Sequence, residues 1–134
     1  MNILGIYGRT FERGRSATVH DAGASLFIDG RHSCSLQAER LTRVKEEDRF
    51  PSETIDAVLK TAGLTPARID CVSIAHTPLM LLVGRDRVAQ HLASIFPNAK
   101  IHFISHHNAH CSATFFASPF DRATVLSFDN GGDS

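Results

Sequence analysis

The chain has 134 residues, of which 43% are hydrophobic, 21% charged and 7% aromatic, the balance of an ordinary globular domain. Its 14 lysines and arginines equal its 14 aspartates and glutamates, so net charge favours neither a nucleic acid nor an anionic membrane as partner. Apolar runs stop far short of the roughly 20 residues of a spanning helix, and the N-terminus lacks a basic leader, so we expect a cytoplasmic protein.

Apolar periodicity predicts alternating strands and helices along the chain. The predicted strands are 2–7, 24–28, 31–38, 71–75, 101–104 and 123–128, and the predicted helices are 52–62, 81–96 and 108–117. Asp29-Gly30 is typical of a two-residue hairpin between the second and third strands. Ser52 suits the N-cap of the first helix, and Gly63 suits its C-terminal stop.

This order of elements predicts an α/β fold. Three opening strands followed by alternating helices and strands indicate a mixed sheet flanked by helices, the plan of one ribonuclease-H-like lobe. The strand at 123–128 runs into a glycine-rich turn with nothing after it, so we expect the chain to be a fragment. The unpaired edge of that apolar strand would favour self-association.

Histidines cluster near the end of the chain, where His106 and His110 have the spacing of one helical turn. Their imidazoles could ligate one divalent metal ion, zinc or non-haem iron, with Asp129 after the next strand as a carboxylate ligand. In the alternative, His106 caps the preceding strand, His110 packs in the core and Asp129 merely starts a turn. The spacing is equally compatible with this alternative. His107 faces elsewhere and is a candidate substrate-binding or supporting group.

Asp129 opens an acidic, glycine-rich turn whose next residues are Asn130, Gly131 and Gly132. Backbone N–H groups of such a turn can approach phosphate, which makes the three residues candidates for nucleotide binding. The turn lacks the Gly-Lys-Ser/Thr ending of a Walker A loop. An ordinary hairpin turn is the alternative.

Two further groups could contact substrate. His20 could accept a proton near neutral pH, with Asp21 beside it, although such a pair is more often structural. Arg43 and Lys45 would face the same side of an extended segment and could bind phosphate or carboxylate. Taken alone, Arg43 and Lys45 are better explained as part of a solvated run of charges.

Several of these pieces stand together in the order and spacing of one known family. They are His20-Asp21-Ala22-Gly23-Ala24-Ser25, the Asp29-Gly30 turn, the run 38–45, Phe50-Pro51, the run 106–113, Ser118-Pro119-Phe120 and the strand ending at Asp129. The combination resembles the amino-terminal part of the carbamoyltransferase family that includes the nodulation and antibiotic-biosynthesis O-carbamoyltransferases. The resemblance covers essentially the whole chain.

The resemblance implies an actin-like fold, with residues 1–122 as its first lobe and 123–134 as the first strand and turn of a second lobe. Members of the family are longer, and their carboxy-terminal domain makes carbamoyl adenylate. The implied activity is ATP-dependent transfer of a carbamoyl group from carbamoyl adenylate, formed with carbamoyl phosphate, to an acceptor hydroxyl. The implied partners are the nucleotide, the acceptor and the C-terminal remainder of the same protein.

The resemblance also assigns roles to the candidate residues. His106, His110 and Asp129 would be iron ligands beside the adenylate, while His20 and Lys45 would belong to the carbamoyl-transfer site. On the residue chemistry given above, Asp21, Arg43 and His107 remain the candidates for substrate binding, and Asn130, Gly131 and Gly132 remain those for nucleotide binding.

Two other functions remain open from the sequence. A relative of the universal tRNA threonylcarbamoyl-transfer protein would share the His-x-x-x-His helix, although a neutral chain favours tRNA little. A binding module for a metal or nucleotide, without catalysis, would share the fold alone.

Overall fold

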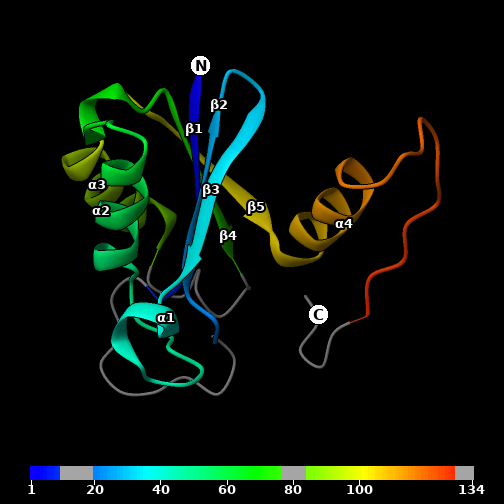
Figure 1. Cartoon of the computed structure of the whole chain (residues 1–134), viewed down its shortest axis with the longest axis horizontal. Coiled ribbons are helices and arrows are strands. Elements are labelled where there is room, and N and C mark those ends of the chain that lie inside the picture. Colours follow the sequence, from blue (N-terminus) through cyan, green and yellow to red (C-terminus); the bar gives the residue numbers. More distant parts are fainter. Residues whose placement is uncertain (10–19, 77–83, 129–134) are drawn as a thin grey trace.

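The computed structural model describes residues 1–9, 20–76 and 84–128, which form a five-stranded sheet with helices on both sides (Figure 1). The strands are β1 (Asn2–Tyr7), β2 (Gly23–Ile28), β3 (Arg31–Gln37), β4 (Cys71–His76) and β5 (Lys100–Ser105). The helices are α1 (Glu39–Thr42), α2 (Ser52–Thr61), α3 (Arg85–Ile95) and α4 (His106–Phe116), with a 3-10 turn, η1 (Pro66–Arg68), before β4.

The sheet is mixed, and its strand order is β3-β2-β1-β4-β5. β2 runs antiparallel to both β1 and β3, whereas β1, β4 and β5 run parallel to one another. The structure thus confirms the α/β class and the mixed sheet predicted from the sequence.

Alternating side chains of the strands build the core on one face of the sheet. Leu4 and Ile6 of β1 are buried there together with Val72 and Ile74 of β4, as the period of two along a strand requires. α2 and α3 cover this face, while α4 lies on the other side (Figure 1). Phe96, just after α3, is completely buried and closes the core.

Turn residues end the elements where the sequence predicts. Asp29 and Gly30 have φ angles of 49° and 76°, the two positive values that a type I′ hairpin turn requires. Gly63 follows α2 with a φ of 65°, a left-handed conformation that costs glycine little. Ser52 is the first residue of α2 rather than its cap, a position held by Pro51.

The predicted strand over 123–128 does not form, which is the main departure from the expected order of elements. A strand needs ladder hydrogen bonds to a neighbour, and the five strands of the described chain pair only among themselves. Leu126 and Phe128 are therefore 75% and 90% exposed. The proposed division into 1–122 and 123–134 stays a prediction.

The helices also differ in detail from the expected ones. The charged run after β3 contains the one-turn helix α1, and α3 begins at Arg85 after residues that lie outside the described part. Phe116, at the end of α4, is 82% exposed. Within the described residues, no helix is both long and apolar enough to span a bilayer.

Candidate functional site

The candidate residues that the structure describes lie at one edge of the sheet, the edge where β1, β4 and β5 end. The antiparallel pairing of Tyr7 with Gly23 and of Gly23 with Gln37 brings the start of β2 and the end of β3 to the same edge. His20 precedes β2, Lys45 follows β3 and α1, and α4 follows β5 directly. In open α/β sheets this is the edge where ligands bind.

His20 and Asp21 form an exposed pair just before β2. The His20 Nδ1 atom lies 2.7 Å from Asp21 Oδ2, and the side chains are 60% and 46% exposed. Asp21 adopts a left-handed backbone conformation, with φ at 59°. The carboxylate therefore fixes the orientation of the imidazole and leaves Nε2 facing outward from this contact.

The segment with Arg43 and Lys45 is not extended, so the prediction that both cations face one side of a strand was wrong. Arg43 ends α1 with φ at 60°, and Glu46 has φ at 56°, so the chain turns twice within four residues. Lys45 occupies the intervening turn and is exposed, as is Arg43.

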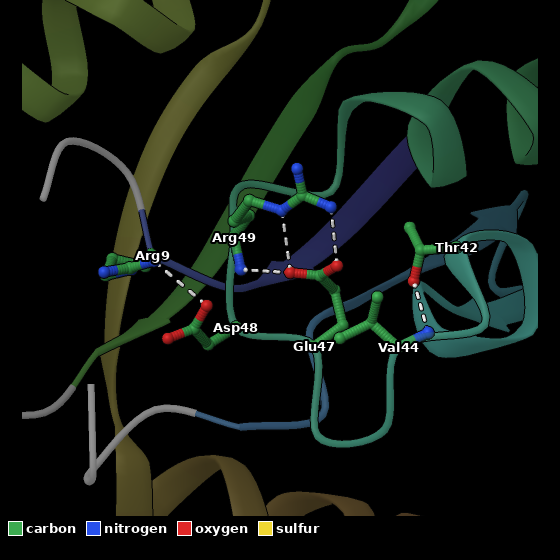
Figure 2. A network of polar contacts seen from close by, with 6 residues as sticks. All are labelled: Arg9, Thr42, Val44, Glu47, Asp48 and Arg49. Carbon is green, nitrogen blue, oxygen red and sulfur yellow. Dashed lines mark hydrogen bonds and ion pairs between the residues drawn. The ribbon is translucent and has the colours of Figure 1, made fainter. Parts of the chain in front are cut away.

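Glu47 lies just after this turn and carries a buried carboxylate. Arg49 donates from Nε to Oε1 at 2.9 Å and from its terminal nitrogen to Oε2 at 2.8 Å (Figure 2). This paired contact holds the pKa of Glu47 at about 2, below its ordinary value of 4.5, although burial acts to raise it. The same contact raises the pKa of Arg49.

Asp48 connects the turn to the end of β1. Its carboxylate accepts a hydrogen bond at 3.0 Å from Arg9, and both side chains are more than nine-tenths buried (Figure 2). The Arg9 N–H also donates to the Asp48 carbonyl oxygen at 2.7 Å, and the Ala22 N–H donates to the Glu47 carbonyl oxygen at 2.7 Å. The turn is therefore tied both to β1 and to the segment before β2.

Gly8 allows this close approach. A Cβ atom at Gly8 would lie 2.8 Å from the Arg49 carbonyl oxygen and 2.9 Å from Pro51 Cδ. Both distances are too short for non-bonded contact, so the 49–51 segment packs on β1 only because the side chain is absent.

A cavity of about 200 Å³ opens beside the same network, lined by Thr42, Glu47, Arg49 and the start of α2. Ligand pockets usually measure about 300–1,000 Å³. The cavity can therefore hold part of a small molecule and not a whole nucleotide.

α4 presents two histidines at its first turn. Ser105 caps this helix, since its Oγ accepts a hydrogen bond from the Asn108 N–H, and the helix therefore begins at His106. The Nε2 atoms of His106 and His110 lie 3.0 Å apart. The prediction that both imidazoles share one face of a helix is confirmed.

This spacing fits two ligands of one metal ion. Metal–nitrogen bonds of about 2.0–2.1 Å place adjacent ligand atoms roughly 2.9–3.4 Å apart, depending on whether the geometry is octahedral or tetrahedral. Within residues 1–9, 20–76 and 84–128, no group of three or more His, Cys, Asp or Glu side chains is arranged to hold a metal. The expected third ligand, Asp129, lies outside the described residues.

His107 contacts the segment after α4, since its Nδ1 atom lies 2.9 Å from Ser127 Oγ, and its ring also lies edge-on to that of His106, 5.8 Å away between centroids. The ring of Tyr7, at the end of β1, lies 6.1 Å from that of His106 between centroids. β1 and the two residues after it therefore contact both groups of candidates, the histidines through Tyr7 and the Lys45 turn through Arg9. The predicted nucleotide-binding residues Asn130, Gly131 and Gly132 lie outside the described residues.

Arg9, Glu47, Asp48 and Arg49 were missed as site residues by reasoning from the sequence. In the sequence these four residues are only charged residues in loops, and such residues are usually exposed to solvent, so nothing in the sequence marks these as buried. The contact between Arg9 and Asp48 spans 39 positions, so only the sheet topology places them together.

Comparison with known proteins identifies relatives along most of the chain. Nodulation protein NolNO of Sinorhizobium fredii is 30% identical over 136 aligned residues, which cover 86% of this chain and 20% of NolNO. An uncharacterized protein of Synechocystis is 27% identical over 90% of this chain and 25% of its own length. The chain thus spans about a fifth to a quarter of these relatives.

Among solved structures, YeaZ from Pseudomonas aeruginosa superposes with a TM-score of 0.55 at 13% identity. The superposition covers 87% of this chain and 48% of YeaZ, and it confirms the actin-like fold. A family model described as "Carbamoyltransferase N-terminus" matches residues 13–84, more than half of the chain. The chain therefore belongs to the carbamoyltransferase N-terminus family.

Proposed function

We propose that the full-length protein is an ATP-dependent O-carbamoyltransferase and that this chain supplies part of its carbamoyl-transfer site. Membership of the carbamoyltransferase N-terminus family supports the class of activity. The observation that carries the proposal is that His20–Asp21, the Lys45 turn and the His106–His110 pair all follow or precede strands at the same edge of the sheet.

In the proposed reaction, the acceptor hydroxyl attacks the carbamoyl carbon of carbamoyl adenylate. A bond forms between the acceptor oxygen and that carbon, the bond from the carbon to the phosphate oxygen breaks, and AMP leaves. His20, oriented by Asp21 at 2.7 Å, accepts the hydroxyl proton. Lys45 and Arg43 stabilise negative charge on the carbamoyl and phosphate oxygens.

We further propose that His106, His110 and Asp129 hold a divalent metal, iron by resemblance to the family. A metal there would neutralise charge on phosphate oxygens. The distance of 3.0 Å between the two Nε2 atoms supports this pairing. Asn130, Gly131 and Gly132 would contact the nucleotide, and His107 the substrate.

The test separates the two half-reactions in the full-length protein. Lys45→Ala and His20→Ala should reduce carbamoyl transfer by about 10²-fold or more, while carbamoyl adenylate still forms from carbamoyl phosphate and ATP. Lys60→Ala, on the exposed side of α2, is the matched control and should change neither reaction. Equal loss of both half-reactions, or no loss, would contradict the proposed site.

A further inference from the structure

We propose that Asp48, through its ion pair with Arg9, is a positioning residue that holds the Lys45 turn against the segment carrying His20. This inference rests on the proposed function, because it takes His20 and Lys45 as the groups that touch substrate. Asp48 itself, 7% exposed and paired with Arg9, would act only through them.

The first support is the set of hydrogen bonds that join the segment after Lys45 to Ala22 and to Arg9. Glu47 is two residues beyond Lys45, and Ala22 is two residues beyond His20, and the Ala22 N–H donates to the Glu47 carbonyl oxygen at 2.7 Å. The next residue, Asp48, is fixed to Arg9 by its backbone carbonyl at 2.7 Å and by its carboxylate at 3.0 Å. The ion pair thus adds a side-chain contact to the two backbone hydrogen bonds at this junction.

The second support is the backbone conformation around both groups. Asp21, Arg43 and Glu46 adopt φ angles of 59°, 60° and 56°, values that non-glycine residues seldom adopt. Asp21 is adjacent to His20, and Glu46 is adjacent to Lys45. Such conformations persist where the surroundings over-determine them, and they cluster at functional sites.

The third support is that stability alone explains the ion pair poorly. The Arg9 side chain is 8% exposed, and its Nε atom is buried with no hydrogen-bond partner among the residues that the structure describes. Burying two charges is costly, and well-packed apolar residues of similar size often stabilise a protein as well or better. A directional pair, in contrast, fixes the position of one segment against another.

The experiment compares Asp48→Asn with the double variant Arg9→Met/Asp48→Leu in the full-length protein. Asp48→Asn strands the buried Arg9 charge and should lower stability, whereas the double variant removes both charges and should regain much of it. We expect kcat for carbamoyl transfer to stay roughly 10- to 100-fold low in both. The KM for carbamoyl phosphate and the rate of carbamoyl adenylate formation should not change.

Arg40→Gln is the matched control, since it removes an exposed pair with Glu39 at 3.6 Å in the same stretch of chain. It should change neither stability nor transfer. Recovery of kcat together with stability in the double variant would show that the pair is merely structural and would overturn the inference.

Hydrogen exchange supplies a readout that does not depend on catalytic activity. The amides of Arg9 and Ala22 should lose more protection in Asp48→Asn than the amides of β4, whose exchange follows the global loss of stability. Unchanged exchange at Arg9 and Ala22 would overturn the inference. If Lys45→Ala abolishes transfer but the double variant keeps full kcat, only the inference about Asp48 is wrong. If Lys45→Ala has no effect on transfer, the proposed carbamoyl-transfer site itself is wrong.

Discussion

His106 and His110 face each other across one turn of α4, with their Nε2 atoms 3.0 Å apart. In the absence of a metal, one neutral imidazole can donate the proton of Nε2 to the lone pair of the other. A metal ion between the rings would instead take both lone pairs, as two histidine ligands of one ion do. The helix therefore presents a preformed pair of metal-ligating nitrogen atoms at the edge of the sheet.

We predict that the purified chain binds one divalent transition metal through this pair. His106→Ala and His110→Ala should each remove most of the bound iron(II) or zinc(II), measured as metal content after dialysis. His102→Ala, an exposed histidine on β5, is the matched control and should keep the metal. Unchanged metal content in both α4 variants would show that the ligands are assigned wrongly.

The second prediction concerns the packing of Gly8 on the 49–51 segment. Gly8→Ala should destabilise the chain by about 1–3 kcal/mol, because its Cβ would lie 2.8 Å from a backbone oxygen that cannot rotate away. Gly5→Ala is the control, since the nearest atom to its Cβ would be 3.7 Å away, an ordinary contact. Urea unfolding of both variants measures the difference, and equal midpoints would contradict the close approach.

The third prediction follows from the low pKa of Glu47, about 2 against an ordinary 4.5. Because the folded state binds the proton more weakly, the carboxylate contributes stability above pH 4.5, and this contribution declines as the pH falls toward 2. The full shift corresponds to roughly 3 kcal/mol. Solvent screening at Arg49, whose side chain is 66% exposed, reduces this to about 1–2 kcal/mol.

Urea unfolding of the chain and of Glu47→Gln at pH 7, 5 and 3 measures this contribution. The stability difference between them should be largest at pH 7 and shrink toward pH 3. Glu53→Gln, also near Arg49 but at the start of α2, is the control and should alter the pH profile little. A difference that stays constant with pH would contradict the role of the Glu47 carboxylate.

The strands, hairpin and α4 histidines could be predicted from sequence because local rules govern them. Leu4 and Ile6 alternate with less buried neighbours along β1, and Asp29-Gly30 satisfies a turn with two positive φ angles. The four-residue spacing of His106 and His110 dictates a shared helical face. Each of these features depends on residues close together in the chain.

The turn around Lys45 could not be predicted because nothing local signals it. Arg43 and Glu46 adopt left-handed conformations that arginine and glutamate do not favour, so residue type does not signal the turn, and contacts with distant parts of the chain help to hold it. The buried Arg9–Asp48 pair supplies such contacts, and its partners are far apart in sequence. The strand expected at 123–128 does not form for a related reason, since an apolar run forms a strand only where a neighbouring strand supplies the ladder hydrogen bonds.

The last prediction is that the 134-residue chain alone does not transfer carbamoyl groups. The side chains of His20 and Asp21 are 60% and 46% exposed, and Lys45 is exposed as well, so water reaches the proposed transfer site freely. Transfer to a hydroxyl requires that water be excluded, because water would otherwise hydrolyse the reactive carbamoyl adenylate. The relatives are four to five times longer than the aligned part, and the superposition covers 48% of YeaZ.

We therefore expect the remainder of the full-length protein to cover this edge of the sheet and complete the site. A sensitive assay with carbamoyl phosphate, ATP and a hydroxyl acceptor should detect no carbamoylated product from the chain alone. Adding the remainder as a separate polypeptide should restore transfer, and Lys45→Ala in the chain should abolish the restored activity. Robust transfer by the chain alone would show that the exposed edge already excludes water and holds the adenylate without further residues.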